Sequence, residues 1–231
     1  MVDSDVRALD DPVGESLRGH HAHLARRVGS AATYLPDVTT FAAVPADAGA
    51  AEWADLARLL GSGALADLFS SPATPPPEWE PVFSLPARRM VGPADGVADA
   101  EPASAVELGP GDVADMLDLV ARTEPGPFWA RTRELGTYLG VRDEHGALVA
   151  MAGERLRPPG WTEISAVCTA PAARGRGHAA RLVRALAARI RSRGERPFLH
   201  VTDSNTAAIA LYERLGFTML EPVTFRGFRV P

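Results

Sequence analysis

The sequence contains no lysine, so arginine supplies all 24 of its strongly basic side chains. A P-loop requires a Gly-Lys-Ser/Thr step, and the absence of lysine excludes that class of nucleotide site. The net charge of −5 gives no excess of positive charge. A nucleic-acid-binding protein is therefore not indicated, because such proteins carry a basic patch or stripe.

Cysteine is almost absent too, since Cys168 is the single one. One thiol cannot form a disulfide within the chain, which fits a reducing compartment. No apolar stretch approaches the roughly 18 residues of a membrane-spanning helix, and residues 1–11 are acidic rather than basic and then apolar. We therefore expect a soluble, cytoplasmic protein without membrane partners.

Two regions rich in proline, glycine or acidic residues divide the chain. Residues 70–77 form a proline-rich loop that cannot supply the N–H donors of a central strand. Residues 91–103 have the composition of a linker. We predict a tail over 1–14, a first domain over 15–90, this linker, and a second domain over 104–231.

The second domain shows a regular alternation of strands and helices. A strand over 105–108 leads through a turn to a helix over 113–122 capped by Asp112. Strands over 137–142 and 148–156 then flank a hairpin turn. The pattern predicts an α/β protein with a mixed sheet.

A glycine-rich turn follows the apolar run 164–169 and opens a helix in which Leu182, Leu186 and Ile190 recur every four residues. Such a turn presents backbone N–H groups at a positive helix end, where phosphates bind. Gly175 and Gly177 lack a Cβ, so their backbone can approach a phosphate and adopt positive φ. The dinucleotide fingerprint is excluded, because only two glycines are present and no acidic residue follows a second strand. A turn that merely reverses the chain is the alternative.

This turn resembles the acetyl-CoA pyrophosphate loop of the GNAT superfamily of N-acetyltransferases. The family pattern, Arg/Gln-x-x-Gly-x-Gly/Ala, is matched by Arg174, Gly177 and Ala179. The strand, the Asn, the Tyr and the Leu-Gly-Phe turn that follow in the family are matched over 198–217. The resemblance implies a GNAT fold and an acetyltransferase that moves the acetyl group of acetyl-CoA to a primary amine by direct transfer in a ternary complex.

The resemblance also implies a cofactor site. In the family, the strand before the loop diverges from its neighbour, and its backbone N–H groups bind pantetheine and polarise the thioester. An Asn contacts the pantetheine arm, and here Asn205 can also cap a helix. Cys168 is expected to pack rather than act as a nucleophile, because no histidine follows nearby. The expected cofactor-binding residues are Val167, Cys168, Thr169, Arg174, Gly175, Arg176, Gly177, His178, Ala179 and Asn205.

Tyr212 matches the residue that in many family members protonates the departing CoA sulfur. Its ordinary pKa of about 10 makes that transfer chemically reasonable. Ile209, Tyr212 and Leu215 also form a helical stripe, so a core aromatic is the alternative.

Glu163 is the first candidate for the base that deprotonates the amine. It is expected on the same alternating face of the strand as Ser165, Val167 and Thr169. Many family members use such a Glu, directly or through water. His200, on the adjacent strand, is the second candidate because of its intrinsic pKa. Either residue can instead be an ordinary strand polar group.

The first domain has fewer signals. Trp53, Leu56 and Leu59 lie at helical spacing, and 38–44 and 79–85 are expected strands. No phosphate loop is present, and the arrangement and size resemble the degenerate N-terminal half of two-lobed members such as the glycine N-acyltransferase-like group. The clustered histidines are not expected to bind a metal, because neighbours in sequence fan around a helix; they are His20, His21 and His23.

The sequence leaves the substrate open. Segment 124–133 corresponds to the family's substrate-side loop, in which Phe128 and Trp129 can line a cleft and Arg131 or Arg133 can hold a carboxylate. The same residues can equally form the faces of a helix. A small amine or amino acid is preferred over a protein amine. The alternatives are an acetyl-CoA sensor without turnover and an interaction module, and a homodimer stays open.

Overall fold

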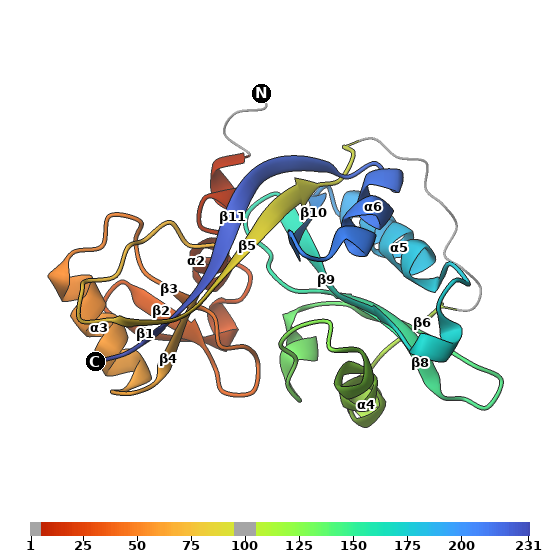
Figure 1. Cartoon of the computed structure of the whole chain (residues 1–231), viewed down its shortest axis with the longest axis horizontal. Coiled ribbons are helices and arrows are strands. Elements are labelled where there is room, and N and C mark those ends of the chain that lie inside the picture. The colour runs from red at the N-terminus through yellow and green to blue at the C-terminus, as the bar shows by residue number, and fades with distance from the viewer. Residues whose placement is uncertain (1–5, 95–104) are drawn as a thin grey trace.

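The computed structural model describes residues 6–94 and 105–231, in which a large mixed sheet is flanked by helices (Figure 1). Its strands lie in the order β4-β11-β5-β10-β9-β8-β7-β6. Among the described strands, β9 and β10 pair in parallel, and the other neighbours are antiparallel. The predicted α/β class with a mixed sheet is confirmed. The strands are β4 (Leu65–Phe69), β5 (Glu80–Val91), β6 (Ala105–Glu107), β7 (Tyr138–Arg142), β8 (Leu148–Glu154), β9 (Trp161–Thr169), β10 (Arg196–Thr202) and β11 (Thr218–Arg229).

The described helices and the small second sheet complete the fold. The α-helices are α2 (Pro12–Arg18), α3 (Ala50–Leu60), α4 (Val113–Thr123), α5 (His178–Ser192) and α6 (Thr206–Arg214). The small sheet is β1 (Ala25–Val28), β2 (Ala31–Tyr34) and β3 (Ala42–Ala43). Short 3₁₀ turns are η1 (Arg7–Leu9), η2 (Ala22–Leu24), η3 (Pro110–Asp112), η4 (Thr132–Leu135) and η5 (Pro171–Ala173). Within the described residues, no helix is long and apolar enough to cross a membrane.

Most predicted elements are confirmed, but the strand expected over 38–44 forms only at Phe41, which bridges Asp67 of β4, and at β3. Val38 closes a turn instead, because its N–H donates to the Leu35 carbonyl oxygen at 3.3 Å. Asp37, just before it, has a φ of 64°, which a continuous strand does not accommodate. The chain straightens only after this turn.

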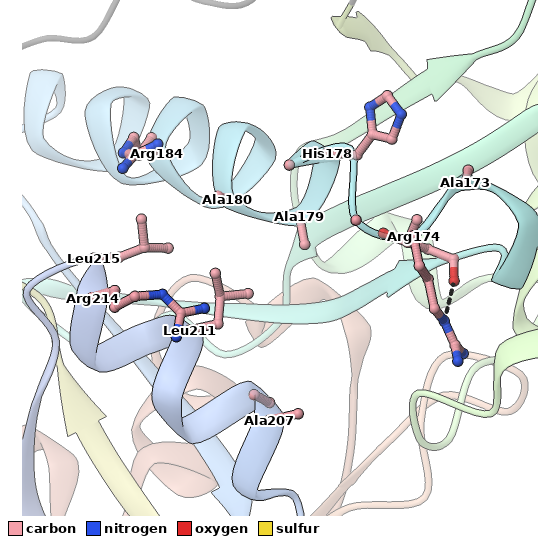
Figure 2. A pocket seen from close by; sticks show the side chains of 14 residues that line it. Ala173, Arg174, His178, Ala179, Ala180, Arg184, Ala207, Leu211, Arg214 and Leu215 are labelled. Atoms are coloured by element: carbon pink, nitrogen blue, oxygen red, sulfur yellow. Dashed lines mark hydrogen bonds between the residues drawn. The ribbon is translucent and has the colours of Figure 1, made fainter.

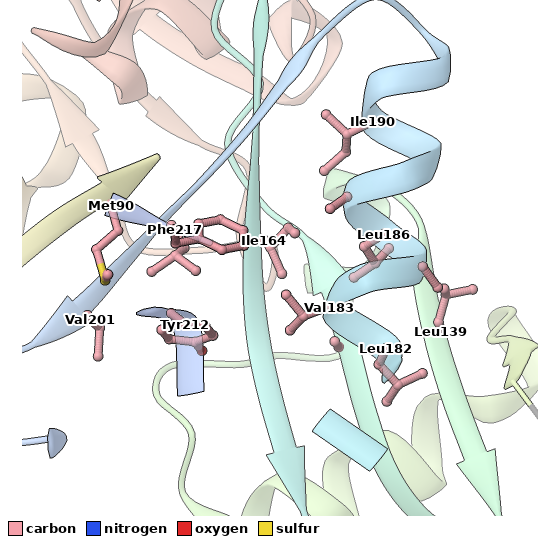
Figure 3. Close-up of a cluster of buried hydrophobic side chains, with 14 of the residues drawn as sticks. Met90, Leu139, Ile164, Leu182, Val183, Leu186, Ile190, Val201, Tyr212 and Phe217 are labelled. Carbon is pink, nitrogen blue, oxygen red and sulfur yellow. The ribbon is translucent and has the colours of Figure 1, made fainter. Parts of the chain in front are cut away.

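Two different layers cover the two faces of the large sheet. On one face, Leu182, Leu186 and Ile190 of α5 pack with Ile164 of β9 and with α6 (Figure 3). Their four-residue spacing places them on one side of the helix, and all three are fully buried. The opposite face is covered by α4 over β7 to β9, and by the N-terminal segment over β10 and its neighbours.

The two predicted domains share the large sheet. β5 precedes the predicted linker, yet it lies between β10 and β11, and β4 pairs with the far end of β11. The long strands β5 and β11 run side by side from the N-terminal elements to the region of α5 and α6 (Figure 1). The division at 91–103 stays a prediction, and residues 95–103 of the linker and 1–5 of the tail lie outside the described residues.

We expect that a chain shortened to begin at Glu101 does not fold by itself. It would lack β4 and β5, which are the two strands that pair with β11. Circular dichroism during heating should show no cooperative transition, and co-expression of residues 1–100 as a separate chain should restore one. Cooperative melting of the shortened chain alone would contradict this expectation.

Candidate functional site

The site begins where β9 and β10 separate. The two strands pair only where Arg196–Phe198 lie beside Trp161–Glu163, and beyond this point no pairing joins them. Just past it, Ala166 and Val167 of β9 lie opposite the single residue Ala152 of β8, between the pairs Gly153 with Ser165 and Met151 with Cys168. Ala166 has a φ of 51°, which is uncommon for a residue with a Cβ. This β-bulge bends β9 away from β10.

The bulge also changes which side chains share a face. Glu163 and Ser165 were expected beside Val167 and Thr169, and this expectation is wrong, because the extra residue shifts the alternation. Val167 packs toward the α5 core. Cys168 packs on the α4 side, and burial raises the pKa of its thiol. The thiol is thereby kept protonated, as a packing residue would be.

The glycine-rich turn has the expected backbone. Gly175 and Gly177 both have a φ of 76°, and Gly177 is the N-cap residue of α5. The Nε of Arg174 donates to the Thr169 carbonyl oxygen at 3.3 Å, which ties the turn back to β9 (Figure 2). The positive φ predicted for both glycines is confirmed.

A cavity of about 840 Å³ lies between this turn, the start of α5 and helix α6 (Figure 2). Arg184 and Arg214, which sequence reasoning missed, line it together with Arg174. No carboxylate is found among the described residues that line it, so the cavity suits an anion. Of the predicted cofactor residues, it contains Thr169, Arg174, Gly175, Gly177, His178 and Ala179, but not Arg176.

A second cavity of about 550 Å³ opens where β9 and β10 diverge. It adjoins the first at Thr169 and Arg174, which line both. Asn205 lines it as well, and its Oδ1 accepts from the Ala208 N–H at 3.1 Å, which confirms the predicted cap of α6. The remaining predicted residues that it brings together are Val167, Cys168 and Tyr212.

Tyr212 belongs both to the core and to this second cavity. Its ring packs 6.0 Å from that of Phe217, between centroids (Figure 3). Only 7% of the residue is exposed, and burial raises the pKa of its phenol to about 12. The hydroxyl therefore keeps its proton at neutral pH and can donate a hydrogen bond into the cavity.

Glu163 is fully buried and lines neither of these cavities. Arg155 donates to its two carboxylate oxygens from Nε at 2.8 Å and Nη2 at 2.6 Å. Burial alone would raise the pKa of Glu163, but Arg155 and then His200 lower it to about 2. A carboxylate held in this way is a poor proton acceptor, so the geometry does not favour Glu163 as the base.

His200 does line the second cavity, but its ring is fully engaged. Arg89 donates from Nε to the His200 Nε2 at 3.1 Å, and the His200 Nδ1 lies 2.7 Å from a Glu163 oxygen. Because arginine only donates, Nε2 must accept, and the ring proton is assigned to Nδ1. Burial lowers the pKa of His200 to about 4. The neutral ring is therefore poorly placed to take a proton.

Sequence reasoning missed one wall of the second cavity, which is formed by Arg155, Asp67 and four phenylalanines and is called the far wall below. Arg155 lies with its guanidinium carbon 4.4 Å from the centre of the Phe69 ring. Asp67 lines the same wall and accepts from Thr40 Oγ1 at 2.8 Å. One signal was available, since Asp67 is a lone carboxylate within the otherwise apolar strand β4. Phenylalanines complete this wall at Phe41, Phe69, Phe83 and Phe225.

The predicted substrate segment lies differently from what was expected. The second cavity is lined by residues 123–127, while Phe128 packs its ring 5.7 Å from that of Tyr138. Arg131 pairs with Glu134 at 2.8 Å, and neither Arg131, Trp129 nor Arg133 lines the cavity. The candidate residues Phe128, Trp129, Arg131 and Arg133 therefore do not meet the other predicted residues.

The histidine cluster has structural partners. His21 is buried, with Nδ1 2.9 Å from the Tyr34 hydroxyl and Nε2 3.0 Å from the Leu135 carbonyl oxygen. His20 Nε2 lies 2.7 Å from an Arg157 nitrogen. Across the part of the chain that the structure describes, no group of three or more His, Cys, Asp or Glu side chains is placed to hold a metal ion.

Known proteins resemble this chain in sequence and in structure. The family model described as FR47-like protein matches residues 138–225. N-alpha-acetyltransferase RimI of Mycobacterium tuberculosis is 37% identical over an alignment of 131 residues that covers 52% of this chain and 81% of that protein. A GNAT-family protein from Novosphingobium aromaticivorans, known from a crystal structure, is 39% identical in sequence. Its TM-score is 0.85, and the match covers 97% of this chain and 99% of that one. A GCN5-related N-acetyltransferase from Kribbella flavida shares the fold, with a TM-score of 0.64 at 18% identity over 96% of each chain.

We expect Gly177→Glu to abolish acetyl-CoA binding in a folded protein. The substitution adds bulk and negative charge to the turn, where backbone N–H groups would meet phosphate. Loss of two charge-assisted hydrogen bonds, at about 1.5–3 kcal/mol each, corresponds to a loss in affinity of at least ~100-fold. Isothermal titration calorimetry measures the affinity.

Gly194→Glu is the matched control for this measurement. Gly194 has a φ of 77°, so the control carries the same backbone strain and charge just past the opposite end of α5. It should bind acetyl-CoA normally. Equal affinities for the two variants would remove the turn from the cofactor site.

Proposed function

The chain belongs to the GNAT superfamily of N-acetyltransferases, and from this premise we propose that it transfers an acetyl group from acetyl-CoA to a primary amine of a small molecule or amino acid. The observation that carries the proposal is the pair of adjoining cavities. One is basic and lies at the start of α5, and the other lies between diverging strands. A pyrophosphate in the first would direct the attached thioester toward the second.

The residues present fit such a cosubstrate. Three arginines and the turn with two positive-φ glycines suit its phosphates. The edge of β9 at Val167–Thr169 no longer pairs with β10, so its backbone can accept the pantetheine arm. Asn205 lies at the same opening. Acetyl-CoA supplies the activated acetyl group when it is bound.

In the proposed reaction the amine nitrogen bonds to the acetyl carbon and the carbon–sulfur bond breaks. Tyr212 faces the cavity with its proton retained, so its hydroxyl stabilises the leaving thiolate. With the Tyr212 pKa at about 12 and an ordinary thiol pKa near 8.5, full proton transfer is uphill. The hydroxyl therefore acts mainly as a hydrogen-bond donor, and the sulfur gains its proton as the product forms.

A protein amine is the second candidate acceptor. It is favoured by the similarity to RimI, which is named an N-alpha-acetyltransferase. The small-molecule acceptor is favoured because residues from the N-terminal half close the far wall of the second cavity, among them Phe41, Asp67 and Phe69. A cavity with this wall leaves little room for a folded protein surface.

The first test follows the release of free thiol from acetyl-CoA with a panel of small amines, amino acids and peptides. We expect thiol release that depends on a small amine. Turnover with peptides alone would favour the protein acceptor. Acetyl-CoA binding without turnover on any amine would indicate a sensor.

We expect Tyr212→Phe to slow acetyl transfer by roughly 10²–10³-fold, the range typical of losing one hydrogen-bond donor to a developing negative charge, if chemistry limits the rate. The change removes one oxygen and little volume, so cofactor affinity and stability should change only slightly. Single-turnover kinetics are the appropriate measurement, because slow product release can hide the step.

Tyr138→Phe is the matched control for Tyr212→Phe. Its hydroxyl is buried, has no hydrogen-bond partner among the described residues, and lines neither cavity. Removing it should leave the rate unchanged and the stability equal or slightly higher. If both variants transfer acetyl at the wild-type rate, Tyr212 is only part of the core.

A further inference from the structure

The far wall of the second cavity is built from one face of three strands. Register places Asp67 of β4 opposite Gly227 of β11, and Phe83 of β5 on the other side of Gly227. Phe69 lies opposite Phe225 in the same way. The wall is therefore a single surface on which one carboxylate is surrounded by aromatic rings.

The aromatic rings are packed against one another. Phe69 stacks on Phe41 with centroids 4.3 Å apart, and on Phe225 with centroids 4.2 Å apart. A Cβ at Gly227 would lie 2.2 Å from the Phe83 ring, so the missing side chain lets that ring lie across β11. The result is an apolar surface of aromatic character next to Asp67.

Asp67 differs from the aromatic residues of this wall because it places a carboxylate in a buried position. It is only 6% exposed, and its partners are Thr40 at 2.8 Å and, electrostatically, Arg155. Burial raises the pKa of Asp67, while Thr40 and Arg155 act in the opposite direction without offsetting it. A desolvated carboxylate of this kind gains most from a cation brought into the cavity.

The cavity also argues against an acceptor that carries a carboxylate. The Arg155 guanidinium, which would pair with one, already holds both oxygens of Glu163. Arg174 is the other arginine of the cavity, and it lies at the junction with the cofactor cavity. The ionisable groups that line the second cavity are Asp67, Glu124, Arg155, Cys168, Arg174, His200 and Tyr212.

We propose that Asp67 binds the ammonium group of the acceptor and takes its proton, and that the phenylalanine wall selects an amine with an apolar, aromatic body and no carboxylate. This inference rests on the function proposed above and names its substrate class. Of the two protons that the nitrogen loses, Asp67 takes the first and passes it to solvent. The second proton that the nitrogen loses accounts, in the overall reaction, for the proton that the sulfur gains.

Binding tests the proposal without turnover. The probes are 2-phenylethylammonium and 2-phenylethanol, which share a ring and chain length but differ in charge. Wild-type protein should bind the ammonium at least ~10-fold more tightly at pH 7, a difference of about 1.4 kcal/mol. Asp67→Asn should lose this preference, and Asp47→Asn should keep it, because Asp47 is an exposed turn residue outside the cavity. Equal preference in wild type and Asp67→Asn would overturn the proposal.

Turnover with 2-phenylethylamine gives a second test. Asp67→Asn should lower kcat/KM by roughly 10²–10⁴-fold while leaving acetyl-CoA affinity unchanged. Asp67 works as a base only when ionised, so wild-type kcat/KM should fall as the pH drops through its raised pKa. This acid limb should vanish in Asp67→Asn, whose rate should rise with pH until the free amine predominates. Phenylalanine should be a much poorer acceptor than 2-phenylethylamine for the wild type.

The melting temperature of Asp67→Asn shows whether a loss of activity comes from catalysis or from misfolding. Because the pKa of Asp67 is raised in the folded state, its ionised form destabilises the fold above the ordinary pKa of a carboxyl. Asp67→Asn should therefore melt at the same temperature as the wild type or higher. Thr40→Val, which removes only the bond that orients Asp67, should lower kcat/KM by less.

The two proposals fail in distinguishable ways. Acetyl transfer to amines with an unchanged kcat/KM and pH profile in Asp67→Asn would overturn the role of Asp67 and keep the proposed function. Acetyl-CoA binding without transfer to any amine would overturn the proposed function and, with it, the base role.

Discussion

The buried carboxylate of Glu163 is the interaction on which the rest of the site depends. It lies at the last position where β9 and β10 pair, and it joins Arg155 and His200. His200 in turn accepts from Arg89 of β5, which pairs with Glu221 of β11. The network thus crosses the sheet where the strands begin to diverge. Removing one member would leave buried charge without a partner, which typically costs about 3–5 kcal/mol.

The two cavities lie on either side of this network and have different linings. On one side, α5 and α6 form the basic cavity with the glycine turn, so this layer is suited to an anionic cofactor. On the other side, Arg155 is held by Glu163 and presents its guanidinium to the aromatic wall. The long strands β5 and β11 connect both regions. Phe41, Asp67 and Phe69 of the N-terminal half therefore line the same cavity as residues of β9 and β10.

Local signals made the glycine-rich turn and helix α5 predictable from the sequence. Glycine spacing indicated the positive φ of Gly175 and Gly177, and helical periodicity indicated α5. The far wall of the second cavity could not be predicted, because Phe41, Asp67 and Phe225 meet only through strand register. The bulge at Ala166 had no sequence signal either. It moved the later side chains of β9 to the opposite face of the sheet from the one expected. Glu163 was predicted as the base, with an ordinary polar strand residue as the alternative, but its partner Arg155 was not predicted, nor was Arg89, which donates to His200.

Burial fixes the charge states around the second cavity, and this restricts which group can move a proton. Glu163, with its pKa near 2, stays ionised, and His200, with its pKa near 4, stays neutral. Tyr212 keeps its proton because its pKa is about 12. Each of these groups therefore holds one protonation state across the neutral range. The carboxyl of Asp67 differs, because burial raises its pKa while no arginine among the described residues forms a salt bridge with it. An incoming ammonium is then the cation best placed to supply both its counter-charge and its proton.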